Sequence, residues 1–162
     1  MNKIKDIQTL IFDFDGVLTD NRVYVDQNGK ELVQCSRADG LAFDVFKKLD
    51  YTLFILSTEK NPVVTARAQK LSIPVIQGTD RKKDILLKMH EQKKIDLAKT
   101  MYVGNDLNDY KAMKICSIKC CPSDSHPKII EISDIVLKSN GGKGVVREII
   151  EQVLQIDILK HI

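Results

Sequence analysis

The stretch Thr9-Leu10-Ile11-Phe12-Asp13-Phe14-Asp15-Gly16 decides the fold, because an apolar, β-prone run ends in two carboxylates and a glycine. Side chains alternate along a strand, so Asp13 and Asp15 share a face if the strand expected over residues 10–14 stays regular. Two crowded carboxylates repel each other, and burying them is costly unless a cation that prefers oxygen ligands, such as Mg²⁺, offsets the charge. The alternative is an edge strand whose solvated acids lead into a turn at Gly16, and this short motif alone leaves both interpretations open.

Length and composition indicate an ordinary globular protein. The 162 residues can bury a substantial core, and we expect one domain over residues 1–162. A net charge of +3 is too small to indicate a nucleic-acid partner. No apolar run reaches the roughly 18 residues that a membrane span needs, and the N-terminus lacks the apolar core of a signal peptide. We therefore predict a cytoplasmic protein that binds neither nucleic acid nor membrane.

The four cysteines, Cys35, Cys116, Cys120 and Cys121, lack the paired spacing of a zinc site, and the three histidines are scattered. We expect them to be reduced and buried as small hydrophobic side chains.

Strand-like and helix-like stretches alternate along the chain. The expected strands are residues 10–14, 52–56, 74–76, 100–103, 118–121 and 135–137. The expected helices are residues 42–49, 61–71, 80–92, 107–115 and 143–154, with another from residue 127. This alternation predicts an α/β, doubly wound fold, with a mostly parallel sheet between two layers of helices. The exception is a β-hairpin formed by 22–25 and 31–35, indicated by Asn28-Gly29 and expected to project beyond the sheet.

Residues whose side chains could bind a ligand or take part in catalysis follow three further predicted strands. Ser57 either binds a phosphate oxygen or caps the next helix. Lys82 lies early in a helix, where a cation is disfavoured, although alone it fits a solvated basic run with its neighbours. The cluster Gly104-Asn105-Asp106-Leu107-Asn108-Asp109 is either part of a site or the polar start of a helix.

Together these elements resemble the four-part signature of the haloacid dehalogenase-like (HAD) phosphohydrolases: DxDG, a serine, a lysine at a helix start, and GNDxxD. Further motifs resemble the 3-deoxy-D-manno-octulosonate 8-phosphate phosphatase subfamily and extend the likeness over residues 10–150. They are Asp39-Gly40, Arg67-Ala68-x-Lys70-Leu71, Gln77-Gly78 and Gly141-Gly142-Lys143-Gly144-x-x-Arg147-Glu148. The resemblance implies a Rossmann-like core and phosphatase activity.

The resemblance also implies a role for each residue. Asp13 resembles the nucleophile that forms an aspartyl-phosphate. Asp15 resembles the acid/base that protonates the leaving alcohol and then activates water. Mg²⁺ would be held by the Asp13 carboxylate, the backbone carbonyl of Asp15 and Asn105. Ser57 and Lys82 would bind the phosphoryl oxygens.

One departure from the family pattern is Asn105, where many relatives carry Asp. An amide oxygen still ligates Mg²⁺, but a charge is lost. Asp106 or Asp109 could compensate directly or through water, so the third side-chain ligand stays open among these three residues.

The chain has no room for the cap domain that many HAD enzymes insert. The segment between Asp15 and Ser57 holds the hairpin and one helix, and the segment from Ile76 to Met101 holds one helix. A site without a cap is open to water, so we expect another subunit to cover it. The subfamily resemblance implies a homotetramer in which the hairpins meet and neighbouring chains line each site.

The substrate implied by the resemblance is a phosphorylated 3-deoxy-2-keto acid sugar of eight or nine carbons. Octulosonate phosphatases commonly carry Ser-Gly-Arg after the second strand. Ser57-Thr58-Glu59 instead resembles nonulosonate (sialic-acid-type) phosphatases and the HAD domains linked to acylneuraminate cytidylyltransferases. Candidate substrate-binding residues are Glu59, Lys60, Arg67 and Arg37. Glu59 could equally be a solvated loop acid, and Arg67 a member of a surface ion pair.

Two other functional classes compete with a phosphatase. One is a non-catalytic oligomerisation domain related to the C-terminal domain of CMP-sialate synthetases, and the presence of both Asp13 and Asp15 argues against it. The other is a phospho-accepting receiver, which keeps its acyl phosphate. Asp15 and the GNDxxD cluster argue against that class.

Overall fold

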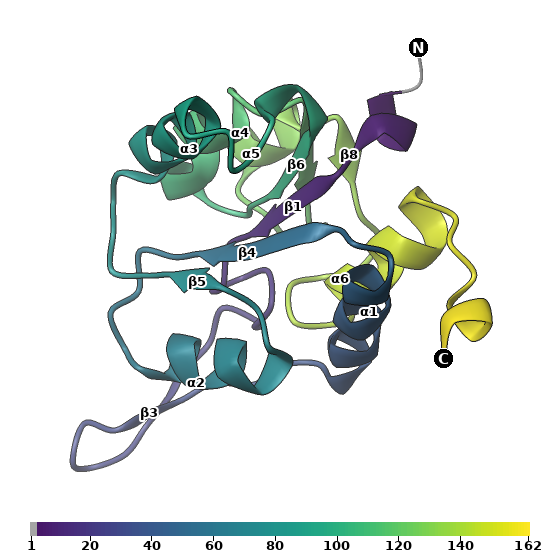
Figure 1. Ribbon diagram of the computed structural model, residues 1–162. Helices are drawn as coiled ribbons and strands as arrows, with labels where there is room; N and C mark the ends of the chain where they lie inside the picture. Colours follow the sequence, from purple (N-terminus) through teal and green to yellow (C-terminus); the bar gives the residue numbers. More distant parts are fainter. Residues whose placement is uncertain (1–2) are drawn as a thin grey trace.

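A parallel sheet of six strands, in the order β5-β4-β1-β6-β7-β8, forms the centre of the computed structural model, which describes residues 3–162 (Figure 1). The first strand, β1 (Thr9–Phe12), lies between β4 (Thr52–Leu56) and β6 (Thr100–Val103). The outer strands are β5 (Val75–Ile76), β7 (Ile118–Cys121) and β8 (Ile135–Val136). The chain passes outward in opposite directions from β1, so the predicted doubly wound topology is confirmed.

Helices cover both faces of this sheet (Figure 1). One face carries α1 (Arg37–Lys48), α2 (Val63–Leu71) and α6 (Val145–Glu148), the last continued by a π-helical turn over Ile149–Val153. The other carries α3 (Lys82–Glu91), α4 (Tyr110–Met113) and α5 (Pro127–Ile132). Short 3₁₀ turns occupy Lys3–Asp6, Leu97–Lys99, Leu107–Asp109 and Ile158–His161.

The core is divided by the sheet into two clusters, and β1 contributes to both. Leu10 and Phe12 pack under α1, α2 and α6, while Ile11 packs under the other helical layer. All three side chains are fully buried, and burial of each contributes roughly 1.5–3 kcal/mol. The strand that leads to Asp13 is therefore held from both sides.

Several helix boundaries differ from those expected. α1 begins at Arg37 rather than residue 42: Ser36 before it is extended, and Gly40 is accommodated within the helix. α3 begins at Lys82 rather than at residue 80. The helix expected over residues 107–115 divides into a 3₁₀ turn and α4, and the closing helix starts only after Gly144, whose φ is 90°.

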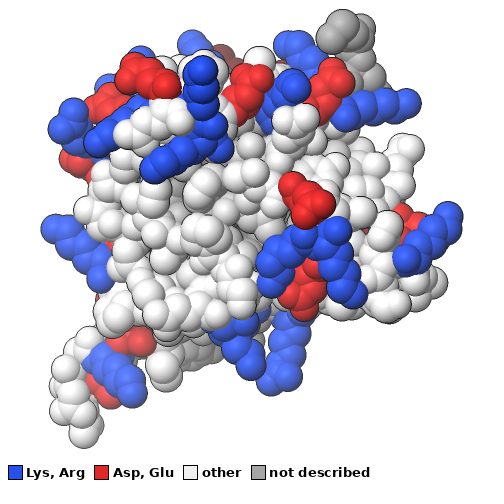
Figure 2. Space-filling model, viewed as in Figure 1, with Lys and Arg blue, Asp and Glu red and all other residues white. Residues whose placement is uncertain are grey.

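The hairpin is present, with shorter strands than expected. β2 (Tyr24–Val25) and β3 (Glu31–Leu32) pair antiparallel, and a bridge between Thr19 and Cys35 closes the base. The hairpin stands clear of the body at the lower left of the view (Figure 1). Charged side chains of both signs lie mainly around the edges of the visible face, and a broad area at its centre carries none (Figure 2).

The cysteines follow the prediction with one exception. Cys116, Cys120 and Cys121 are buried, whereas Cys35 at the base of the hairpin is half-buried, because the projecting ribbon leaves this position partly uncovered. Within residues 3–162, no helix is both long and apolar enough to cross a membrane.

Candidate active site

The predicted site residues follow β1, β4 and β6, which end at the same edge of the sheet. Main-chain bonds extend the sheet just past the strands: Asp13 N donates to Val103 O at 2.9 Å, and Ser57 N donates to Ile76 O at 2.9 Å. Ligands of doubly wound sheets bind at this carboxyl edge, beside the strand where the order reverses. The topology therefore brings Asp13, Ser57 and Asn105 to one edge on a rigid support.

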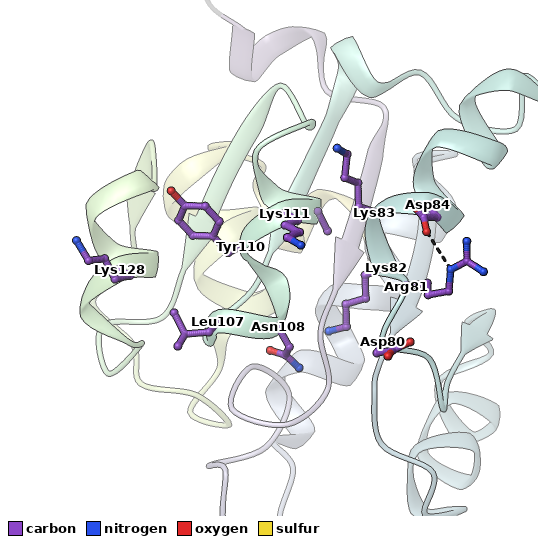
Figure 3. Close-up of a pocket in the computed structure, with 11 residues that line it drawn as sticks. Asp80, Arg81, Lys82, Lys83, Asp84, Leu107, Asn108, Tyr110, Lys111 and Lys128 are labelled. Carbon is purple, nitrogen blue, oxygen red and sulfur yellow. Dashed lines mark hydrogen bonds and ion pairs between the residues drawn. The ribbon is translucent and has the colours of Figure 1, made fainter.

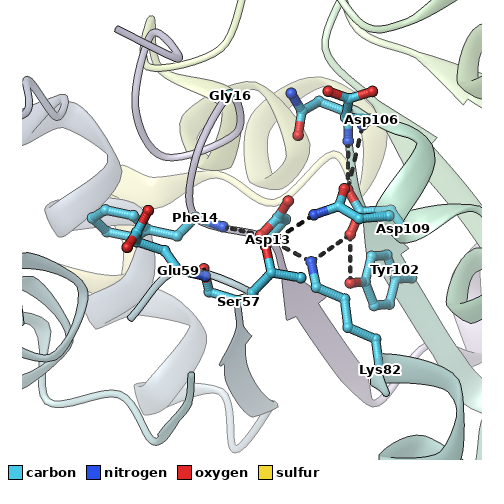
Figure 4. A network of polar contacts seen from close by, with 12 residues as sticks. Asp13, Phe14, Gly16, Ser57, Glu59, Lys82, Tyr102, Asp106 and Asp109 are labelled. Carbon is cyan, nitrogen blue, oxygen red and sulfur yellow. Dashed lines mark hydrogen bonds and ion pairs between the residues drawn. The ribbon is translucent and has the colours of Figure 1, made fainter. Parts of the chain in front are cut away.

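Lys82 forms the centre of a buried charge cluster (Figure 4). Its Nζ lies 3.0 Å from Asp13 Oδ1 and 2.7 Å from Asp109 Oδ1, with all three side chains buried. Burial acts to lower the pKa of Lys82, but the two carboxylates outweigh it and raise that pKa above its usual value. Burial and then the Asp109 carboxylate raise the pKa of Asp13, while Lys82 opposes them.

Lys82 does not belong to a solvated basic run. Its neighbours Arg81 and Lys83 are exposed, whereas Lys82 is 1% exposed. In Figure 3 the Lys82 side chain points in the opposite direction from Lys83. A hollow of about 1070 Å³ lies beside it, between the start of α3 and residues 107–112. The helix start thus presents one cation to the strand ends and leaves the others in solvent.

The sequence left open whether Asp109 is a metal ligand, and the structure shows what its carboxylate contacts. Its Oδ1 accepts hydrogen bonds from Lys82 Nζ and, at 2.8 Å, from Tyr102 OH. Its Oδ2 accepts from the backbone N–H of Asn105 at 3.0 Å and of Asp106 at 3.4 Å. With both oxygens engaged, Asp109 orients Lys82 and the loop after β6. The spacing in GNDxxD was the signal, since it places an acid one helical turn after Asn105.

Asn105 has the features of an available oxygen ligand. It is 7% exposed, and its Oδ1 is buried with no hydrogen-bond partner among the described residues. A β-carbon at Gly16 would clash with the Asn105 amide, so only glycine lets the turn after Asp15 pack against it. His126 N donates to Asn105 O at 2.8 Å and fixes the backbone from the other side.

The same residues fit a divalent cation. Among the described residues, Lys82 pairs with both buried carboxylates and Asp15 lies close by, so a second positive charge would be stabilised here. The free amide oxygen of Asn105 adds a neutral ligand. Within residues 3–162, no three His, Cys, Asp or Glu side chains gather as a metal site, so the predicted set depends on this amide and the Asp15 carbonyl.

Asp15 lies in different surroundings from Asp13. It is half-buried, and its pKa is raised by burial and then by Glu59 and Glu31. A carboxyl group with a raised pKa retains a proton more readily, as a general acid must. The strand ends at Phe12, so simple alternation does not continue through both acids.

The loop after β4 is held by its own side chains. Ser57 is 1% exposed, and its Oγ accepts from Glu59 N at 3.1 Å. Glu59 Oε1 accepts from the backbone N–H of Lys60 at 2.7 Å and of Asn61 at 2.8 Å. Glu59 is therefore an ordered loop acid rather than a freely solvated one, while Lys60 is exposed.

Arg67 forms no ion pair with any residue in 3–162, so the surface ion pair considered as its alternative is not seen there. Its Nη2 donates to Ser36 O at 3.0 Å and joins α2 to the start of α1. Together with Arg37 and Lys70 it lines a hollow of about 390 Å³ between these helices. Its role in substrate binding, like that of Arg37, stays a prediction.

Residues 44–149 match the haloacid dehalogenase-like hydrolase family. The chain belongs to this family. It is 32% identical to the 3-deoxy-D-manno-octulosonate 8-phosphate phosphatase of Escherichia coli (strain B / BL21-DE3) over 155 residues, 95% of this chain and 82% of the relative.

Solved structures of the haloacid dehalogenase-like family share the fold. A cobalt-bound deoxy-D-mannose-octulosonate 8-phosphate phosphatase from Haemophilus influenzae is 29% identical, with a TM-score of 0.88, and the match covers 95% of this chain and 91% of that one. The Moraxella catarrhalis enzyme, in complex with magnesium, phosphate and KDO, is 30% identical, with a TM-score of 0.88 and coverage of 94% and 88%.

The family and these relatives identify the chain as a phosphatase with a doubly wound core. Within residues 3–162, the segments where haloacid dehalogenase-like enzymes often carry a cap hold only the hairpin and single helices, as expected.

Proposed function

We propose that this phosphatase is a Mg²⁺-dependent phosphomonoesterase that acts on a phosphorylated 3-deoxy-2-keto acid sugar through an aspartyl-phosphate on Asp13. The observation that carries the proposal is the buried cluster in which Lys82 lies between Asp13 and Asp109, with the free amide oxygen of Asn105 nearby. The magnesium-, phosphate- and KDO-bound relative supports the choice of cofactor and substrate class.

In the proposed mechanism, an Asp13 oxygen attacks phosphorus while the bond from phosphorus to the sugar oxygen breaks. Asp15, whose raised pKa suits a proton carrier, donates a proton to the leaving oxygen. Water then attacks phosphorus and gives a proton to Asp15, while the bond from phosphorus to the Asp13 oxygen breaks; inorganic phosphate leaves, and both acids return to their starting states. Lys82 and Ser57 bind the phosphoryl oxygens and oppose the repulsion between carboxylate and phosphate.

The bound metal would supply charge neutralisation for the transferring phosphoryl group. The Asp13 carboxylate, the Asp15 backbone carbonyl and the Asn105 amide would hold it. Asp109 is engaged by Lys82, Tyr102 and two N–H groups, which favours Asn105 over Asp109 as the third side-chain ligand.

The first candidate substrate is 3-deoxy-D-manno-octulosonate 8-phosphate, because the curated relatives are named for it. A nonulosonate 9-phosphate is the second candidate. Glu59 lies two residues after Ser57, where octulosonate phosphatases commonly carry Arg, and it is held in the loop beside Asp15. An acid there favours a hydroxyl or amine of the substrate as its partner. Lys60, Arg67 and a neighbouring subunit are the candidate partners for the substrate carboxylate.

The test is phosphate release from both sugar phosphates by the purified chain, with Mg²⁺ and with excess chelator. We expect turnover with Mg²⁺ on at least one of them and loss of turnover with chelator. Full activity after chelation would overturn the metal role. Absence of turnover on both substrates with Mg²⁺ would overturn the proposed substrate class.

We also propose that the active unit is a homotetramer assembled through the hairpin. Apolar side chains on the hairpin are largely exposed: Val23 by 50%, Tyr24 by 73%, Val25 by 61% and Leu32 by 56%. A ribbon of two strands is marginally stable alone, and exposed apolar strands favour pairing with other chains. A closed, symmetric assembly would cover these side chains and the open site together.

A further inference from the structure

Asp39 is a buried carboxylate outside the cluster around Lys82. It is 2% exposed, and its Oδ1 accepts from the backbone N–H groups of Val146 at 2.9 Å and Arg147 at 3.1 Å. Its Oδ2 is buried without a hydrogen-bond partner among the described residues. Burying a carboxylate with one oxygen unsatisfied costs free energy, so we expect Asp39 to have a structural or functional role that offsets this cost.

The first turn of α6 needs a capping oxygen from elsewhere in the molecule. Gly144 precedes the helix with φ of 90° and has no side chain with which to cap it. An N-cap oxygen normally accepts from the second or third residue of the helix, which here are Val146 and Arg147. Asp39 supplies that oxygen from α1, a neighbouring helix on the same face of the sheet.

The loop that leads into α6 lies directly on the turn after the catalytic acids. Gly142 N donates to Val17 O at 2.9 Å, and a β-carbon at Gly142 would come within 2.6 Å of Asp20 N. A β-carbon at Gly141 would clash with Gly16 O. Since Gly16 also packs against the Asn105 amide, this turn is enclosed between two loops and cannot shift independently of them.

From these contacts we propose that Asp39 is a positioning residue for the phosphatase reaction. By capping α6 it holds the Gly141–Gly142 loop against the turn that carries Asp15. The proposal rests on the phosphatase function proposed above. Other bonds hold the approach to the loop: Glu148 accepts from Lys138 N and Ser139 N, each at 2.8 Å, and Asp124 accepts from Gly141 N at 2.9 Å. Asp39 holds the segment that follows the loop, the first turn of α6.

The test compares three variants with the wild-type chain. Asp39→Ala removes the cap, Asp39→Asn keeps an acceptor oxygen of the same reach, and Asp44→Ala removes an exposed acid of the same helix that pairs with Lys47. The measurements are kcat, KM and the Mg²⁺ dissociation constant by calorimetry, at a temperature where circular dichroism shows each variant folded.

We expect Asp39→Ala to lower kcat about tenfold or more with little change in KM, because small displacements of reacting groups are costly. It should also weaken Mg²⁺ binding, since the Asp15 carbonyl belongs to the displaced turn. Asp39→Asn should keep kcat within about twofold of wild type, and Asp44→Ala should match wild type, because the exposed acid makes no contact with the loop.

Two results would overturn the proposal. One is a folded Asp39→Ala variant with wild-type kcat and Mg²⁺ affinity. The other is equal impairment of the Ala and Asn variants, which would assign the effect to charge rather than to the cap. If Asp39→Ala does not fold, Asp39→Ser replaces it. The serine hydroxyl is polar, but it is one bond shorter than the carboxylate and so reaches less far toward the amides of α6. An inactive wild-type chain would contradict the proposed function instead, so the two failures are distinguishable.

Discussion

Asp13 and Asp15 are separated by one residue, yet their surroundings assign them different chemistry. Asp13 is buried beside Lys82, with its Oδ1 also accepting from Phe14 N at 2.7 Å. Asp15 is half-buried beside Glu59 and Glu31, which add to the effect of burial in raising its pKa. This difference in surroundings suits the roles proposed above, in which Asp13 is the nucleophile and Asp15 the proton carrier.

Asp13→Asn should abolish turnover, by about 10³-fold or more, because an amide cannot form the aspartyl-phosphate. The unfolding temperature at neutral pH should be no lower than that of wild type, since burial makes the Asp13 charge costly and Lys82 keeps Asp109 as a partner. Steady-state kinetics and thermal unfolding check both parts. Residual turnover above a few per cent would exclude the covalent mechanism.

Asp39 should make stability depend on pH. Burial raises its pKa from 3.8 to about 6, against the opposing effects of the Val146 and Arg147 amides and the Arg67 and Arg147 side chains. A raised carboxyl pKa means that its stabilising effect is complete below pH 3.8 and is lost as pH rises through about 6. The free energy of unfolding of wild type should therefore fall by up to about 3 kcal/mol relative to Asp39→Asn across that window.

Urea unfolding of both chains at several pH values between about 3.5 and 7.5 measures this difference. Other groups that titrate in the same range cancel, because the two chains share them. Parallel curves for the two proteins would contradict the assignment.

At the scale of an element, the residue at which α3 begins sets the direction of the Lys82 side chain. Starting at Lys82, the helix directs that side chain to the strand ends and leaves Lys83 in solvent. Leu86 and Met89 bury the same helix against the sheet. The position of Lys82 is therefore determined by the packing of the whole helix.

Lys82→Ala should lower kcat by about 10²-fold or more, since it removes the charge proposed to stabilise the transferring phosphoryl group. It should also lower stability, because Asp13 and Asp109 are left without their cation. Lys83→Ala is the matched control and should stay within about twofold of wild type, as exposed substitutions usually have small effects. Equal, small losses in both variants would remove Lys82 from the mechanism.

The hairpin is the element that connects the chain to its proposed assembly. Tyr24 and Leu32 face each other across β2 and β3 and are both exposed, whereas Val33 packs partly against the core. The pair Tyr24→Glu and Leu32→Lys places opposite charges on facing positions, which keeps the hairpin paired and removes its apolar surface.

At the scale of the whole molecule, this double variant should sediment as a smaller species and lose activity in parallel, because the open site would lose its cover. Analytical ultracentrifugation and kinetics at the same concentration give the comparison. Leu159→Lys is a control, since Leu159 is 77% exposed near the C-terminus and away from the hairpin. A wild-type chain that sediments as a fully active monomer would contradict the assembly.

The sequence by itself determined the fold class, the DxDG strand end, the four-part signature and the hairpin. The strands and the hairpin follow from local patterns, namely apolar runs bounded by turn residues and the positive-φ preference of Asn28-Gly29. The four-part signature was found as a resemblance to a known family. The strands expected over residues 52–56, 100–103 and 118–121 have the same bounds in the structure.

Only the tertiary structure decided which charged groups meet. Lys82 reaches Asp109 across 27 residues, and Asp39 caps Val146 across 107, and no local pattern encodes such pairings. The same is true of the start of α1, where Arg67 holds Ser36 O from another helix. Local propensity shows where an element can form, whereas packing of distant segments decides where it begins and which buried charge it stabilises.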